Sequence, residues 1–117
     1  MSKTQRLTRA DFALMGRARR QIHGTLFSLS VFKLPEAAEG LKFACVVSKK
    51  ASPKAVERNR LKRRCRECAH QALEKFNAPL ALVFRAKKGS GGTSHASICR
   101  DVQALVEKLI NTGHTPQ

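Results

Sequence analysis

The segment from Lys49 to Arg66 holds the chain's densest group of side chains able to bind another molecule. It contains nine Lys or Arg residues and a single acid, Glu57. So many like charges repel one another until an anion neutralises them, which favours an anion-binding surface over a merely solvated one. Guanidinium and ammonium groups donate hydrogen bonds to phosphate oxygens, and the chemistry of the segment therefore fits a nucleic acid best.

The apolar residues in and after this segment recur at three- and four-residue steps, which predicts a helix with one face packed into a protein core. The inward face holds Leu61, Cys65, Cys68, Ala69, Ala72, Leu73 and Phe76. The outward face holds Asn59, Arg60, Arg63 and Arg66, flanked by Lys62 and Arg64. We expect Ser52 to cap the helix and Pro53 to open its first turn. The sequence therefore predicts a docked helix that presents its outer face to a polyanion.

The composition fits one domain over residues 1–117, ordered from about residue 6 to residue 111, with nucleic acid as its leading partner. The chain is 42% hydrophobic, enough for one core, and its formal net charge is +15. An anionic membrane is the main competing partner, but no apolar run approaches the roughly 20 residues that a spanning helix needs. The first residues also lack the apolar core of a secretion signal. We expect a cytoplasmic protein with no membrane partner.

Before the basic helix, the pattern predicts a short helix, a loop and two strands. The short helix turns Phe12 and Met15 inward and ends near Gly16. Residues 24–34 and 41–48 alternate in the manner of strands, and their short connection predicts an antiparallel hairpin. The loop between the short helix and the first strand is basic and holds Arg17, Arg19, Arg20 and His23.

After the basic helix, residues 80–84 form a short apolar run that is typical of a buried strand. A loop rich in Gly and Ser spans residues 89–94. A final amphipathic helix turns one apolar side inward, formed by Ile98, Val102, Leu105, Val106 and Leu109. The predicted order is α-β-β-α-β-α, with room for one further short strand. This order indicates the α+β class, as a single-domain sandwich of helices on a small sheet.

Cys65 and Cys68 have the spacing of a zinc-ligand pair, yet they fall in mid-helix on the apolar face. Structural zinc usually has four ligands, with such pairs on turns, whereas a free Cys packs as a small buried hydrophobe. We therefore expect core packing and no bound metal.

Catalytic side chains are not expected anywhere in the chain. The eight acids fall on helix surfaces and one loop, so the pattern does not predict converging carboxylates that hold Mg²⁺. This distribution disfavours an autonomous nuclease. DNA binding is disfavoured as well, because neither a helix-turn-helix spacing nor a dimerisation heptad occurs.

The run from Lys54 to Arg63, KAVERNRLKR, resembles the RNR box of the bacterial ribonuclease P protein subunit. The likeness extends over roughly residues 6–109. Three further stretches resemble the family's opening helix, the strand before its basic helix and its late strand. These are Arg6-Leu7 with Asp11-Phe12, Val47-Ser48-Lys49-Lys50 and Val83-Phe84-Arg85.

The resemblance implies the fold of ribosomal protein S5 domain 2, with an unusual left-handed βαβ crossover. It implies the non-catalytic protein subunit of an endonuclease that removes the 5′ leader from precursor tRNA. In that family the RNA subunit performs the hydrolysis with Mg²⁺, and the protein alone binds no cofactor. The implied partners are the catalytic RNA and precursor tRNA. A structural RNA-binding protein, such as a small ribosomal component, is the alternative that the charge alone leaves open.

The resemblance also assigns residues to two surfaces. The RNA-binding residues are Lys49, Lys50, Lys54, Arg58, Asn59, Arg60, Lys62, Arg63 and Arg66. The cleft for the leader takes Lys62 and Arg66 with Phe12 and Phe32, because aromatic rings stack on single-stranded bases. Two further cleft aromatics of the family fall at Gly16 and Ser30 in this chain. We therefore expect a weaker leader grip, partly compensated by Phe32 on the same strand face as Ser30.

Overall fold

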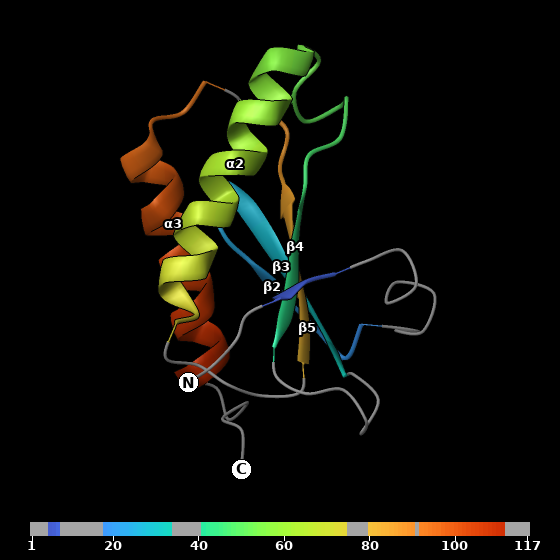
Figure 1. The fold of residues 1–117 in the computed structure, drawn as a ribbon, viewed down its shortest axis with the longest axis vertical. Helices are drawn as coiled ribbons and strands as arrows, with labels where there is room; N and C mark the ends of the chain where they lie inside the picture. Colours follow the sequence, from blue (N-terminus) through green and yellow to red (C-terminus); the bar gives the residue numbers. More distant parts are fainter. Residues whose placement is uncertain (1–4, 8–17, 34–40, 75–79, 91, 112–117) are drawn as a thin grey trace.

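A five-stranded sheet with two helices on one of its faces makes up the described part of the chain (Figure 1). The computed structural model describes residues 5–7, 18–33, 41–74, 80–90 and 92–111. This arrangement confirms the predicted α+β class. The elements are β1 (Gln5–Arg6), β2 (Arg20–His23), β3 (Phe27–Lys33), β4 (Lys42–Val46), α2 (Ala55–Ala72), β5 (Leu80–Ala86) and α3 (His95–Asn111).

Strand β5 lies at the centre of the sheet, whose order is β1-β4-β5-β3-β2. It pairs with β3 in antiparallel and with β4 in parallel orientation. The predicted hairpin between β3 and β4 is therefore wrong. These two strands run in opposite directions, but β5 occupies the pairing position between them. Helix α2 links β4 to β5, because two neighbouring parallel strands need a crossover connection.

The basic segment before β3 forms strand β2 instead of the predicted loop. It pairs antiparallel with β3, with Arg20 opposite Val31 and Ile22 opposite Leu29. Ile22 is buried, and its two neighbours in β2 are exposed. Charged and polar side chains suit such an edge strand, because they discourage pairing with another chain. The predicted short helix with Phe12, Met15 and Gly16 lies outside the described residues, as do Arg17 and Phe76.

Alternate residues of β3 face two separate apolar clusters, as its sequence pattern predicted. Phe27, Leu29 and Val31 belong to the large cluster that also holds the buried residues of α2 and α3. Phe32 points to the opposite face of the sheet and joins a smaller cluster with two residues of β5. The helices therefore cover one face of the sheet, which fixes the side from which α2 projects.

Helix α3 buries all the residues that its periodicity predicted, and α2 buries most of them, with Ala72 only half-buried. Helix α3 turns the five expected side chains into the core. Neither helix is long and apolar enough to cross a bilayer, within the part of the chain that the structure describes. Helix α2 buries four residues, Leu61, Cys65, Cys68 and Ala69, and Leu73 directly after its last turn is buried too.

The start of α2 differs from the prediction. The helix begins at Ala55, and its N-cap residue Lys54 makes no side-chain capping bond. Ser52 is buried, and its hydroxyl donates a hydrogen bond to Glu57 Oε2 at 3.3 Å. Arg58 Nη1 donates to the carbonyls of Ser52 at 3.0 Å and Pro53 at 2.7 Å. Side chains of the first helical turn therefore hold the preceding loop in place, and Ser52 does not cap the helix as predicted.

The turn between β2 and β3 is tied to α3 by the carboxylate of Asp101. Its two oxygens accept hydrogen bonds from the backbone N–H groups of Thr25, Leu26 and Phe27, at 2.9, 3.0 and 2.9 Å. A Cβ atom at Gly24 would lie 2.9 Å from Asp101 Oδ2 and from the Phe27 carbonyl oxygen. The close approach therefore requires glycine at this position. Sequence reasoning placed Asp101 merely on a helix surface and missed this role.

Candidate nucleic-acid interface

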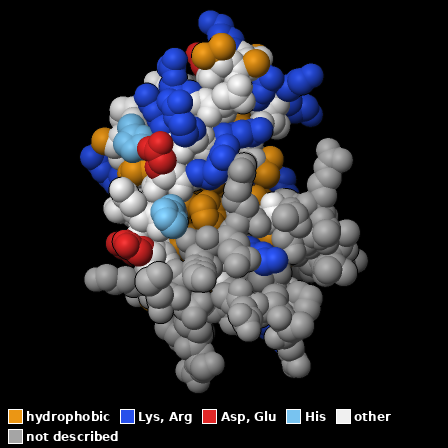
Figure 2. All heavy atoms as spheres, in the orientation of Figure 1, with side chains coloured by type: hydrophobic (Ala, Val, Ile, Leu, Met, Phe, Trp, Pro, Cys, Tyr) orange, Lys and Arg blue, Asp and Glu red, His pale blue; other side chains and the backbone are white. Residues whose placement is uncertain are grey.

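The structure places the predicted RNA-binding residues on α2 and on the turn that precedes it. Three of them, Arg58, Lys62 and Arg66, are half-buried. Figure 2 shows Lys and Arg side chains gathered over the upper part of one face, where α2 lies in Figure 1. The exposed members of the set are Lys49, Lys50, Lys54, Asn59, Arg60 and Arg63. The chain therefore presents a cationic surface to solvent, although which residues bind RNA stays a prediction.

The cations of α2 divide into those held by the protein and those that project from it. Arg58 is engaged by the two carbonyls of the preceding loop. Arg64, which the prediction placed only on the flank, is half-buried and donates to the Thr93 carbonyl at 3.4 Å. Arg60 and Arg63 lie on the exposed side of the helix. We infer that these two are the best placed to meet phosphates with little desolvation of the protein.

Lys62 and Arg66 line a hollow of about 140 Å³ beside β1 and β4. The other lining residues are Leu7, Phe43, Ala44 and Cys45. The structure thus brings together two of the four residues predicted for the leader cleft. It also adds Cys45, which the sequence reasoning did not consider, because the contact joins separate elements.

Phe32 does not lie in this hollow, because it points to the sheet face opposite α2. It is 8% exposed and Ser30 is 5% exposed, so the strand face that was expected to contribute Phe32 to the leader cleft is buried. Leu7 contacts both regions, because it packs against the Phe32 cluster and also lines the hollow beside Lys62 and Arg66. Phe12 lies outside the described residues. Leader stacking by either ring stays a prediction.

A larger hollow, of about 420 Å³, lies elsewhere, between the β2–β3 turn and α3. Among the described residues it is lined mainly by small and polar side chains, with Arg100 as the one cation. Asp101, which also lines it, accepts three backbone hydrogen bonds. The cations that could bind a polyanion therefore lie on the face of α2, and the volume of a hollow does not identify the candidate site.

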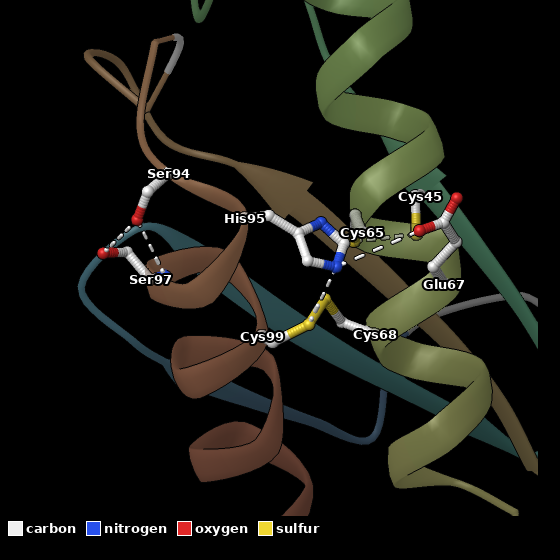
Figure 3. The surroundings of a disulfide bond; sticks show 8 residues. All are labelled: Cys45, Cys65, Glu67, Cys68, Ser94, His95, Ser97 and Cys99. Atoms are coloured by element: carbon white, nitrogen blue, oxygen red, sulfur yellow. Dashed lines mark hydrogen bonds and ion pairs between the residues drawn. A yellow bond between two sulfur atoms is a disulfide. The ribbon is translucent and has the colours of Figure 1, made fainter.

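Two cysteine pairs connect α2 to its neighbours (Figure 3). Cys68 and Cys99 form a disulfide between α2 and α3. The Cys45 thiol of β4 lies 2.8 Å from Cys65 Sγ. Core packing of Cys65 and Cys68 is confirmed, because they are 0% and 1% exposed, but the expectation that both are free thiols is wrong for Cys68, which is bonded to Cys99. Sequence reasoning missed the pairing, since the spacing along one helix does not show which elements pack against it.

We expect the stability of the protein to decline in mildly alkaline solution because of Cys65. Burial, helped by the adjacent Cys45 thiol, raises the pKa of the Cys65 thiol well above its usual range. The folded state therefore keeps this proton when the unfolded chain begins to lose it, near pH 8.5. From that pH upward the free energy of unfolding falls, by up to about 1.4 kcal/mol per pH unit for one proton.

Urea unfolding at pH 7.5 and pH 9.5, in constant reductant, checks this dependence against a Cys65→Ala variant. At both pH values the free energy of unfolding of the variant is lower by about 1 kcal/mol, because a buried sulfur atom is removed. It is expected to show a shallower decline with pH than the unaltered protein. Equal declines in the two proteins would contradict the assignment to Cys65.

Converging carboxylates do not occur among the residues that the structure describes. One group of three or more His, Cys, Asp or Glu side chains is close enough to hold an ion there, and it consists of Cys68, His95 and Cys99. This composition suits soft metals better than Mg²⁺, which prefers oxygen ligands. The described residues thus combine a cationic surface on α2 with no cluster of carboxylates.

Comparison with known proteins relates the whole arrangement to one family. The family model for ribonuclease P matches residues 1–110. The ribonuclease P protein component of Microcystis aeruginosa is 33% identical over 110 residues, which cover 91% of both chains. The corresponding protein of Streptomyces bikiniensis is 36% identical over 78 residues, which are 67% of this chain and 63% of that relative.

Solved structures share the fold at lower sequence identity. The ribonuclease P protein of Staphylococcus aureus superposes with a TM-score of 0.74 at 19% identity, covering 91% of this chain and 95% of that one. The ribonuclease P protein of Thermotoga maritima gives a TM-score of 0.72 at 21% identity, covering 89% and 96%. At such identities the superposition supports the fold, and the family match rests on the sequence.

Proposed function

Because the chain belongs to the ribonuclease P protein family, we propose that it is the protein subunit of a ribonuclease P that removes the 5′ leader from precursor tRNA. The observation that carries this proposal is the cationic outer face of α2, fixed to the sheet by the buried face of the same helix. A rigid helix places its charges at defined positions, which suits a folded RNA better than a disordered basic arm does.

The protein acts by binding and positioning, and the partner RNA carries out the chemistry. Arg60 and Arg63 neutralise phosphates of the RNA subunit, and Asn59, the residue before Arg60, adds directional hydrogen bonds. Lys62 and Arg66 hold the leader phosphates beside β1 and β4. By reducing repulsion between two RNA molecules, these cations tighten precursor binding and raise Mg²⁺ occupancy in the RNA. The protein supplies no catalytic residue and no ligand to that Mg²⁺, and it works in the cytoplasm.

Cleavage of a labelled precursor tRNA at low Mg²⁺ tests the proposal. Three reactions contain a bacterial ribonuclease P RNA alone, the protein alone, or both together. We expect correct removal of the 5′ leader only with both components, because RNA–RNA repulsion is otherwise unscreened at low Mg²⁺.

Two outcomes would contradict the proposal and would point to different functions. Binding of the RNA without stimulation, tried with ribonuclease P RNAs from several bacteria, would favour a structural RNA-binding protein. Cleavage by the protein alone would favour an autonomous nuclease. The Arg60→Gln, Arg63→Gln double variant, purified in the same way, is the control for a contaminating nuclease, because a contaminant would cleave equally in both preparations.

A further inference from the structure

Three side chains of zinc-ligand type meet where α2 packs against α3. The sulfur atoms of Cys68 and Cys99 and a ring nitrogen of His95 lie within 4.8 Å of one another. His95 and Cys99 are one turn apart on α3, so both lie on the side of the helix that faces α2 (Figure 3). His95 Nε2 lies 3.6 Å from Cys99 Sγ.

A fourth possible ligand atom lies near the His95 ring. Glu67 precedes Cys68 on α2, and its Oε2 lies 3.9 Å from His95 Nε2. The imidazole nitrogen therefore faces a sulfur atom from one direction and a carboxylate oxygen from another. Figure 3 shows the ring and the carboxylate on opposite helices, both directed toward the space outside the Cys68–Cys99 pair.

These spacings approach those of a tetrahedral zinc site. Zinc bonds of about 2.3 Å to sulfur and 2.0–2.1 Å to nitrogen or oxygen set the edges of the tetrahedron. They require about 3.6 Å between sulfur and nitrogen and about 3.4 Å between nitrogen and oxygen. The structure has 3.6 Å and 3.9 Å for these two edges. The structure departs from this geometry in two respects. The two sulfur atoms are bonded to each other, and Glu67 does not belong to the group of three whose ligand atoms lie within 4.8 Å of one another, so its side chain must move to complete the site.

We propose that the reduced protein binds one Zn²⁺ ion between α2 and α3, through Cys68, Cys99, His95 and Glu67. The expectation of no bound metal considered the Cys65–Cys68 spacing within one helix. The structure instead offers ligands from two helices, while Cys65 is directed at Cys45. Two thiolates neutralise the ion and the carboxylate leaves the site with a net charge of −1, so the site adds no positive charge for RNA and serves to join the two helices.

Zinc and the disulfide are mutually exclusive occupants of this place. Two monothiol molecules reduce the Cys68–Cys99 bond, giving two protein thiols and one molecule of the reagent's disulfide. Zinc then binds as the two thiols lose their protons, and the sulfur atoms separate to about 3.8 Å. An oxidant that accepts two electrons, such as a small-molecule disulfide, re-forms the bond and releases the ion.

Cobalt titration of the untagged full chain, reduced with a phosphine, tests the site directly. We expect one Co²⁺ per chain, with the intense visible bands of tetrahedral coordination and a thiolate charge-transfer band, and displacement of Co²⁺ by Zn²⁺. Cys99→Ser is expected to abolish the signal. His95→Ala should weaken cobalt binding by on the order of tenfold or more, and Glu67→Gln by less, since water can take the fourth position.

Matched controls separate this site from other thiols and imidazoles. Cys45→Ser removes a cysteine from the neighbouring pair, and His70→Ala removes an exposed histidine from α2. Both controls should titrate like the unaltered protein, and circular dichroism confirms that each variant is folded. Absence of tetrahedral bands would overturn the proposal, as would an unchanged titration of folded Cys99→Ser or loss of the bands in folded Cys45→Ser.

Discussion

Replacing Arg60 and Arg63 together by Gln is expected to weaken binding of ribonuclease P RNA by on the order of a hundredfold at moderate salt. Each Arg makes charge-assisted hydrogen bonds to phosphate, and about 1.5 kcal/mol for each corresponds to roughly tenfold in affinity. Both side chains are exposed on α2, so their removal leaves the core intact. Filter binding or fluorescence titration over a series of salt concentrations measures the effect.

The salt dependence gives the sharper result. Every phosphate contact that is lost should reduce the slope of log K against log salt by about 0.7–0.9. We therefore expect a decrease of about 1.4–1.8 for the double variant. Arg100 and Lys108, two exposed cations of α3, provide the control, since their replacement by Gln removes the same net charge from another helix. Equal losses of slope in the two double variants would show that only overall charge matters and would contradict a defined interface on α2.

Replacing Asp101 by Ala is expected to reduce the free energy of unfolding by about 2–4 kcal/mol. The variant loses three hydrogen bonds to a charged acceptor and leaves backbone donors of the β2–β3 turn without it. For a domain of this size the loss corresponds to a fall in melting temperature of on the order of 10–20 °C. Chemical and thermal unfolding measure both quantities.

Two further variants test whether the turn or the helix is responsible. Glu107→Ala removes an exposed acid from the same helix and should change the free energy of unfolding by less than about 0.5 kcal/mol. Gly24→Ala places a methyl group 2.9 Å from the Asp101 carboxylate and should destabilise the turn from its other side. A stable Asp101→Ala protein would show that water replaces the carboxylate at little cost.

Local periodicity was enough to predict which side of a helix or strand is buried, because any apolar core can cover that side. Helix α3 and strand β3 bury the residues that steps of three, four or two assign to their inner faces. The inner face of α2 was predictable for the same reason, and its outer face followed, because a helix with one buried side exposes the other. The cationic surface was therefore visible in the sequence before any tertiary contact was known.

Features that depend on which elements become neighbours were not predictable in this way. The hairpin prediction failed because β5, distant in sequence, pairs with both β3 and β4. Ser52 failed as a cap because its hydroxyl is buried against Glu57. The cysteine pairs and the three hydrogen bonds of Asp101 join residues that are 20 or more positions apart, a separation over which one sequence carries no pattern. The leader cleft stays a prediction.

The central position of β5 also bears on how the chain reaches its native state. Residues 80–86 are synthesised after both of their partner strands, so β3 and β4 leave the ribosome without the strand that lies between them in the sheet. Pairings of such long sequence separation are slow, because loop-closure entropy is lost before they form. We expect α2 to gain helical structure early and the sheet to close late, in a single cooperative step. In that interval the nascent chain exposes unpaired strand edges. Electrostatic repulsion between chains that carry many Lys and Arg residues then protects them against aggregation.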